Sequence, residues 1–510
     1  MAIGWKLHGD GTTPPPGEVV MPDERLSWGR TIGLGAQHVV AMFGATFVFP
    51  LVMGLDPNLA IMMSGVATVL FLLIVQGKVP SYLGTSASFV GGVAAIRAAG
   101  GSSATVTGSI LVAGVVLAIV GALIHFLGAR VIHTILPPVV TGAVVMLIGF
   151  NLAPVVAGIY WPQDQWIALL TMAFVILASV LLRGFLARIA VFLGLVFGFV
   201  VSYLADKIFG QISSFSPGAG KITTHDRVDF TNVRHADWIG LPSFHAPDFK
   251  TSAILLTLPA VIALIAENTG HVKAVAAMTR TDLDGTLGRA LFGDGVGTVL
   301  ASAVGGSPTT TYAENIGVMA ATRVYSTAAY FVAAAVAVLF GLCPKFGALI
   351  AATPGGVLGG ITVVLYGMIG LLGAKIWIEN RVDFANPVNL IPVAAGIIIA
   401  IGNTTLQITK NFSLAGIAFG TLVTVIGYHL VRMVAPAHMR ESIDRGEVFG
   451  GGTSLALGNV DEASLGEAGF DEGAGNLSSD PGRAAAGSRE VSGSDGGATR
   501  TDGRGPRRRR

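Results

Sequence analysis

Apolar stretches long enough to cross a lipid bilayer follow one another from about residue 30 to residue 435. A helix needs about 20 apolar residues to span the hydrocarbon core of a membrane, and several of the stretches are shorter than that. Only 12% of the residues are charged, about half the share found in an ordinary soluble chain. Too few polar side chains remain to cover a water-facing surface, so the sequence predicts an all-α polytopic membrane protein.

The apolar pattern divides into fourteen predicted spans, of which the third and the tenth are the most irregular. With the N-terminus inside, ten Lys and Arg residues fall in the cytoplasmic loops and three in the short external loops. Because loops rich in Lys and Arg stay in the cytoplasm, both termini are expected there and the long segment 206–250 outside. The predicted spans are centred on 31–53, 58–76, 82–98, 105–128, 135–157, 165–182, 187–205, 252–273, 287–304, 308–321, 325–343, 356–374, 388–403 and 413–435.

Two polar segments flank the predicted transmembrane transporter domain, residues 29–435. Residues 1–28 are polar and Pro-rich and lack the apolar region of a signal peptide, so they are expected to form a cytoplasmic N-terminal segment. Residues 436–510 hold too little apolar surface to fold and are expected to form a disordered cytoplasmic tail. Its last arginines, Arg507–Arg510, could touch anionic membrane lipid, although a solvated tail without a role also accounts for them.

A weak internal repeat relates the two halves of this domain. The fifth predicted span opens with Pro137-Pro138, and the twelfth opens with Thr353-Pro354, about 217 residues later. A repeat of seven spans has an odd number of crossings, so its second copy enters the membrane from the opposite side. The pattern therefore predicts a 7+7 inverted repeat, the architecture of secondary transporters that bind substrate where broken helices meet.

Two carboxylates lie inside predicted spans, where ionisable groups are costly and normally functional. Glu267 lies in the eighth span and Glu314 in the tenth. His271 follows Glu267 by four residues and is expected on the same face of the helix. These acids are candidates for a substrate and proton pathway. The alternative is that Glu267 and His271 only pair with each other to hold helices together.

The third and tenth spans do not read as ordinary helices. Gly305, Gly306 and Pro308 precede the run Thr309-Thr310-Thr311, and β-branched residues favour extended backbone. Residues 80–92 show a similar pattern of Pro, Gly and small polar residues. Extended backbone at membrane depth is tolerated only inside protein or beside a cavity. We therefore expect two short paired strands, with the half-helices that follow them pointing free N–H groups at one site.

Such a site suits a flat heterocycle with ring N–H donors and carbonyl acceptors, such as a pyrimidine. Glu267 and Glu314 could accept from ring N–H groups, and the backbone amides of Ala87 and Ala313 could donate to carbonyls. Aromatic side chains would supply flat packing surfaces, although helix packing alone explains each of them individually. These aromatic candidates are Tyr312, Phe89 and Tyr366.

At these residues the sequence resembles the nucleobase–ascorbate transporter family and, within it, bacterial uracil permeases and the pyrimidine-utilisation permeases. The most specific match is the segment 314–323, which fits an acid or amide followed by Asn-x-Gly-x4-Thr-basic. Segments 77–86, 266–271 and 309–320 also look like those of uracil permeases, and PDERL (22–26) like the pyrimidine-utilisation subgroup. The matching signature residues are Gln37, His38, Asn315, Gly317, Thr322 and Arg323.

The resemblance implies a fold with core and gate domains, and short antiparallel strands in spans three and ten. It implies symport of a nucleobase with a proton across the cell membrane by a homodimer, without a cofactor. Carried over by position, Glu267 and Glu314 match substrate-binding acids and His271 a histidine linked to proton coupling. Ala87 departs from the Phe of many uracil permeases, and Glu314 departs from the Gln of the purine branch, which favours uracil over xanthine or urate.

Other functions fit the sequence less well. A purine or broad-range nucleobase permease remains the main alternative, and an anion transporter of the same architecture would avoid two glutamates. A membrane enzyme would need a nucleophile–base set that does not accompany Glu267 and His271. The single Cys343 excludes an internal disulfide and a cysteine-based metal cluster, and the net charge of +2 gives no reason to expect nucleic acid.

Overall fold

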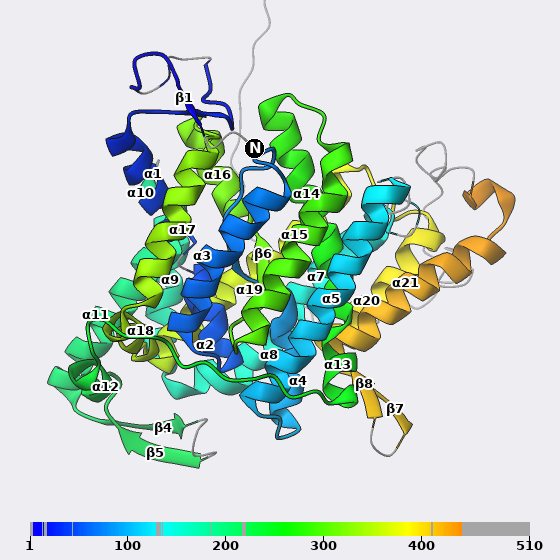
Figure 1. Cartoon of the computed structure of the whole chain (residues 1–510). Helices are drawn as coiled ribbons and strands as arrows, with labels where there is room; N and C mark the ends of the chain where they lie inside the picture. The colour runs from blue at the N-terminus through cyan, green and yellow to red at the C-terminus, as the bar shows by residue number, and fades with distance from the viewer. Residues whose placement is uncertain are drawn as a thin grey trace, which may run out of the picture. The chain divides into compact units, whose positions relative to one another are not determined.

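The computed structural model describes residues 4–440 except 13, 15–17, 43, 129–133, 135, 184, 217–220 and 410–411, so the predicted tail lies almost entirely outside the described residues. The described chain is mostly helical (Figure 1). Its helices are α1 (Trp28–Ala41), α2 (Phe49–Met53), α3 (Pro57–Ile74), α4 (Val90–Ala98), α5 (Ser103–Leu127), α7 (Pro138–Phe150), α8 (Ala153–Val155), α9 (Gln165–Leu181), α10 (Phe185–Arg188), α11 (Ala190–Phe209), α12 (Thr231–His235), α13 (Thr251–Thr257), α14 (Pro259–Thr279), α15 (Asp284–Ala303), α16 (Ala313–Thr322), α17 (Thr327–Gly341), α18 (Pro344–Ala351), α19 (Gly355–Glu379), α20 (Pro387–Ile401) and α21 (Gly416–Val434).

Eight short strands accompany these helices and form four two-stranded sheets. The pairs are β1 (Lys6–Leu7) with β2 (Glu24–Arg25), β3 (Leu83–Thr85) with β6 (Thr309–Thr311), β4 (Ile212–Ser216) with β5 (Lys221–His225), and β7 (Thr405–Thr409) with β8 (Phe412–Ala415).

Seven described helices, or up to nine if each bent pair counts as one, are long and apolar enough to cross a membrane. Several helices inside the predicted spans fall short of this length, among them α4, α9 and α20. A short helix can still be part of a crossing when a strand or a bend completes it. The structure therefore establishes a protein with several membrane-spanning helices, and the number fourteen stays a prediction.

The helices pack mainly as two groups. The first bundle consists of α1, α3, α4, α5 and α13–α18, and the second bundle of α7, α9, α11 and α19–α21. Contacts between the bundles run chiefly through α14, which touches α7 and α21, and through α4, which touches α21. A cavity lies along the interface between these two bundles.

Glycines bring the two central helices of the second bundle into close contact. A Cβ at Gly149 of α7 would lie 2.2 Å from the backbone nitrogen of Gly370 on α19. A Cβ at Gly373 would lie 2.3 Å from the carbonyl oxygen of Gly142. The pairing of 149 with 370 and of 142 with 373 makes the two helices antiparallel. Such small residues let helix backbones approach where no water is available to drive packing.

The strands β3 and β6 pair antiparallel inside the first bundle, with Leu83 opposite Thr311 and Thr85 opposite Thr309. They lie where the sequence predicts extended backbone in the third and tenth spans. Side chains of neighbouring helices complete their hydrogen bonds: Thr68 accepts from the Leu83 amide at 2.9 Å, and Thr298 accepts from the Thr309 amide at 3.1 Å. All six strand residues are buried, so this extended backbone lies inside protein.

The described part of the N-terminal segment is fastened to the turn between α16 and α17. Val20 pairs with Val324, its amide donating to the Arg323 carbonyl at 2.9 Å and its carbonyl accepting from the Tyr325 amide at 2.8 Å. The indole of Trp5 donates to the Thr327 hydroxyl at 2.8 Å. This segment therefore packs as part of the fold, against the end of α16 that lies away from Glu314.

Candidate functional site

A cavity of about 450 Å³ lies between the two bundles beside β3 and β6. Residues from α14 and α16 form one wall, and residues from α7 and α19 form the other. The cavity brings together six of the residues predicted from sequence to bind substrate or protons. They are Ala87, Glu267, His271, Tyr312, Ala313 and Glu314.

The acids reach this cavity from two helices of the first bundle. Glu267 lies midway along α14, and Glu314 lies in the first turn of α16, directly after β6 and Tyr312. Tyr312 caps α16 without a side-chain hydrogen bond, and the first-turn amides of a helix have no backbone acceptor within the helix. The cavity thus has carboxylate acceptors and backbone donors on the same side. A flat ligand carrying both N–H and carbonyl groups fits that combination.

His271 lies one turn beyond Glu267 and shares a hydrogen bond of 2.9 Å with the Thr311 hydroxyl of β6. In the described part of the chain no ion pair joins His271 to Glu267. The alternative in which these two residues only pair with each other therefore has no support from the geometry. His271 instead connects α14 to the strand that leads into Tyr312 and Glu314.

A third acid, Asp294 on α15, is fully buried behind this wall, whereas Glu267 is half-buried and Glu314 is exposed. Its Oδ2 accepts from the side-chain amide of Asn268 at 2.5 Å and from the Thr310 hydroxyl at 2.9 Å. Asp294 and Asn268 are fully buried, and Oδ1 of each has no hydrogen-bond partner among the described residues. The sequence analysis missed Asp294, although an acid inside the ninth predicted span meets the same criterion that singled out Glu267.

The signature residues lie on both sides of one buried contact. Nδ1 of His38 on α1 is 2.7 Å from Oδ1 of Asn315 on α16, directly after Glu314. Gln37 is half-buried on the same helix, and Gly317 lines the cavity where a Cβ would meet open space. Thr322 and Arg323 end α16, with Arg323 at φ 58°. The signature thus sets the position of the helix that carries Glu314.

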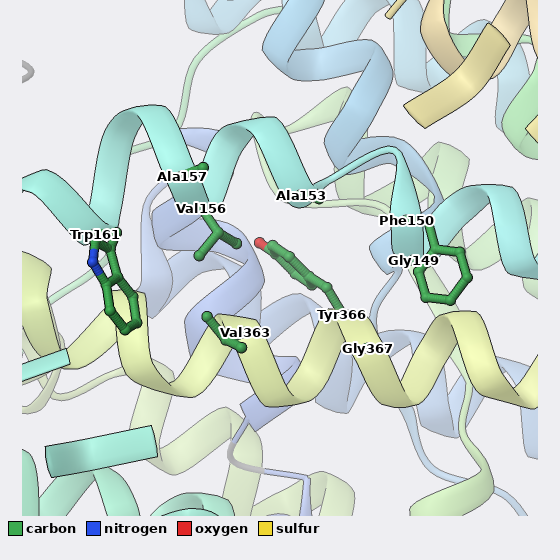
Figure 2. A pocket seen from close by; sticks show the side chains of 9 residues that line it. All are labelled: Gly149, Phe150, Ala153, Val156, Ala157, Trp161, Val363, Tyr366 and Gly367. Atoms are coloured by element: carbon green, nitrogen blue, oxygen red, sulfur yellow. The ribbon is translucent and has the colours of Figure 1, made fainter. Parts of the chain in front are cut away.

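Two predicted aromatic residues lie outside the cavity. Phe89 is fully buried in the apolar core, because the helical turn Ala87–Phe89 directs it away from the opening. Tyr366 lies on the other side of α19 in a second cavity of about 440 Å³, where its hydroxyl points toward Val156 (Figure 2). Its ring stacks on the ring of Phe49, with 6.3 Å between the two ring centroids, and Phe49 lines the first cavity. The predicted direct contact of Phe89 and Tyr366 with substrate therefore gains no support from the structure.

The first cavity extends along α19 toward one end of the molecule. Its lining residues on α19 run from Leu365 to Glu379, about 21 Å at the helical rise. Lys375 and Glu379 lie at that end, 3.6 Å apart. Toward the other end of α19, Val48 packs against Tyr160 and Leu358 in a buried apolar cluster. The first cavity therefore follows the half of α19 that ends at Glu379, and an apolar cluster packs near the other end of the helix.

No group of three His, Cys, Asp or Glu side chains that could hold a metal ion occurs in the described ranges. The chemistry available to the cavity is hydrogen bonding and the gain or loss of protons by carboxylates and an imidazole. This combination suits binding and release of a neutral ligand.

Comparison with known proteins gives a consistent result. A model described as the permease family matches residues 29–409. The RutG protein of Escherichia coli, named as a pyrimidine permease, is 44% identical over 83% of this chain and 93% of its own length. The uracil permease of Bacillus caldolyticus is 36% identical over 79% of this chain and 92% of its own length. A solved structure of the murine anion transporter Slc26a9 has a TM-score of 0.58 over 80% of this chain and 68% of that one, at 11% identity, and so shares the fold.

Proposed function

Since this chain belongs to the permease family, we propose that it imports uracil, or a closely related pyrimidine nucleobase, together with protons. It is a multi-pass membrane transporter and not an enzyme. The observation that carries the proposal is the placement of Glu267 and Glu314 on one cavity, beside the paired strands β3 and β6.

In this proposal the substrate ring lies between the bundles with its edge toward the first bundle. Glu267 and Glu314 accept from the ring N–H groups, and the amides near Ala87 and Ala313 donate to its carbonyl oxygens. Tyr312 contributes packing surface, and Phe89 and Tyr366 act from the layer behind the cavity. Each carboxylate thus accepts from a ring N–H group, which an apolar or anionic ligand would not supply. Two acids also disfavour an anion as the substrate, because like charges repel in a poorly solvated site.

Proton coupling follows from the cost of an ion in a poorly solvated site. A carboxylate that loses its ligand and its water in a closed state is strongly destabilised unless it takes up a proton. Glu267, with His271 one turn away, is the group that we assign to this step, and Glu314 assists it. Binding of proton and substrate together must be more favourable than binding of either alone.

We also propose that the fold is a 7+7 inverted repeat of fourteen spans, with the first bundle as core and the second as gate. Two observations support it. α7 and α19, which open with the related Pro motifs, pack antiparallel, and β3 and β6, from equivalent spans of the two halves, also pair antiparallel. Both termini would lie in the cytoplasm, residues 436–510 would form a tail, and the protein would work as a homodimer in the cytoplasmic membrane. The cavity would then open toward the cytoplasm.

Uptake of labelled uracil by cells that lack their own uracil transporter tests the function. Glu267→Gln and Glu314→Gln keep the shape of each side chain but remove the negative charge, and we expect each to lower uptake at least about tenfold, the loss of one charged hydrogen bond. Glu18→Gln, at a side chain that is 61% exposed, is the control. Normal uptake by both cavity variants at equal membrane levels would overturn the proposal.

The second candidate function is a purine or broad-range nucleobase permease. The cavity volume favours it, because 450 Å³ exceeds the size of a single pyrimidine ring. Competition of uracil uptake by thymine, xanthine and urate separates the two. We expect thymine to compete and the two purines to leave uptake unchanged. Equal competition by xanthine would favour the second candidate.

A further inference from the structure

The chain between α11 and α13 is fastened at its two ends to different bundles. This tether, residues 227–248, leaves the second bundle after the β4–β5 hairpin, forms α12, and then runs in extended form past α18 toward α13 (Figure 1). We propose that the tether limits how far the first bundle can move relative to the second, and that α12 is the part that lengthens. The inference rests on the proposed transport function, because it concerns the movement that transport requires.

The first end of the tether is held by one buried arginine. Nε of Arg227 is 2.8 Å from Oδ2 of Asp164, the N-cap of α9, and Nη1 is 3.1 Å from Oδ1 of Asp206 in the last turn of α11. The three side chains are only 13%, 9% and 11% exposed. Burial lowers the pKa of Arg227, but the hydrogen bonds and charges of both aspartates outweigh it and raise this pKa above its usual value. The guanidinium of Arg227 therefore stays charged at neutral pH.

Neighbouring groups extend this anchor along the second bundle. The Arg227 and Val228 amides each donate to the Asp206 carboxylate at 3.0 Å. The ring of Phe230 lies 5.7 Å from that of Phe199 and 6.1 Å from that of Tyr203, both on α11. The tether thus belongs to the second bundle up to Phe230.

The other end of the tether crosses the ends of five helices of the first bundle. The Gly240 amide donates to Leu342 after α17 at 3.0 Å, and the Asp237 carbonyl accepts from Lys345 of α18 at 2.9 Å. Further along, three backbone amides donate to α3, α15 and α5 in turn. These bonds are Ser243 to Asp56 Oδ2 at 3.2 Å, His245 to the Val304 carbonyl at 3.2 Å, and Asp248 to the Ala104 carbonyl at 2.8 Å.

One of these contacts reaches the strand at the site. The ring of His245 lies against Gly305, where a Cβ would come within 2.4 Å of Nδ1 and where φ is +95°. Gly305 begins the turn that leads into β6 and then to Tyr312. This end of the tether therefore moves together with the first bundle and with β6.

Residues 231–236 lie between the hydrogen-bonded ends, and α12, which packs against α18 of the first bundle, occupies five of them. Five helical residues rise about 1.5 Å each, whereas extended residues reach about 3.5 Å each, so unwinding α12 lengthens the tether by about 10 Å. A helix this short has little stability of its own, so the cost of unwinding it lies mainly in its packing against α18. The tether would permit a displacement of that order and resist a larger one.

A reversible staple tests this inference. Thr231→Cys and His235→Cys, in a Cys343→Ser background, place two thiols one turn apart on α12 for a reducible bifunctional reagent. The matched control carries Leu241→Cys and Phe244→Cys, two exposed positions within the part fastened to the first bundle. We expect the α12 staple to lower uracil uptake at least tenfold, with uracil binding unchanged and uptake restored by reduction, and the control staple to have no effect.

Unchanged uptake after complete stapling of α12 would overturn the inference, and so would an equal loss of uracil binding, which would indicate damage to the site. Absence of uracil uptake before the reagent is added would instead count against the proposed function. A variant with Gly-Ser-Gly-Ser inserted after Phe230 gives an independent measurement. Its longer tether should restore uptake to the stapled protein, and failure to do so would also overturn the inference.

Discussion

The side-chain amide of Asn268, the residue directly after Glu267, donates to Oδ2 of Asp294 over 2.5 Å. The same oxygen accepts from the Thr310 hydroxyl of β6 at 2.9 Å. One buried carboxylate therefore joins α14, α15 and the strand beside the cavity. The position of Glu267 relative to β6 therefore depends on a group that lies outside the cavity.

Asp294→Ala should destabilise the protein and abolish uptake. The substitution leaves the Asn268 amide and the Thr310 hydroxyl without an acceptor in a buried site, at a cost of about 1–3 kcal/mol for each. Thermal unfolding of the detergent-solubilised protein measures this cost, together with uracil uptake. Asp284→Ala, at an exposed position of the same helix, is the control. Equal unfolding temperatures for the two variants would show that the Asp294 contacts contribute nothing.

The contact between His38 and Asn315 should couple α1 to α16. His38→Ala and Asn315→Ala each remove one partner of the 2.7 Å contact. In a double-mutant cycle on the free energy of unfolding, we expect a coupling energy of about 1 kcal/mol. Additive effects of the two substitutions would mean that the contact does not stabilise the fold.

Of two glycines on neighbouring helices, only one should be sensitive to substitution by alanine. Gly149→Ala places a methyl group 2.2 Å from the Gly370 nitrogen, so α7 and α19 must separate, and overpacking of this kind costs about 1–3 kcal/mol or more. Gly367→Ala adds a methyl group that meets nothing within 4 Å. We expect a clear drop in unfolding temperature for the first variant and none for the second. The reverse order would contradict the close approach of the helices.

Ala87→Phe should narrow the range of substrates. Ala87 lines the cavity and is only 8% exposed, so an aromatic ring there would occupy part of the space beside Tyr312. An aromatic surface stacked on a flat substrate contributes about 0.5–1.5 kcal/mol, or a two- to tenfold lower KM for uracil. Thymine, with its extra methyl group, should compete less well than it does with the unmodified protein. Unchanged competition would place Ala87 outside the substrate-binding surface.

The sequence predicted the local features of the site better than the contacts between them. The Thr309–Thr311 run and the glycines before it indicated extended backbone, because β-branched residues and glycines act through local conformation. Glu267 and Glu314 were found because a charge inside a span is costly whatever surrounds it. Asp294 was missed, and only the fold brings its partners Asn268 and Thr310 to one oxygen.

The aromatic residues show why side-chain direction was harder to predict. Phe89 is two positions from Ala87, yet a single helical turn sends it into the core. Tyr366 follows Leu365, which lines the first cavity, by one position on α19, yet its side chain lies in the second cavity (Figure 2). Hydropathy also could not determine the number of spans, because helices such as α4 and α16 are too short to be identified as membrane spans by their length.

The attachment of the N-terminal segment to the α16–α17 turn has a practical consequence for purification. Val20 and Trp5 hold the turn that ends the helix carrying Glu314, so an affinity tag or a deletion that displaces them also disturbs that helix. Assays on material tagged at the front of the chain would then underestimate its native rate. Cleaving such a tag before reconstitution into liposomes should restore the native transport rate.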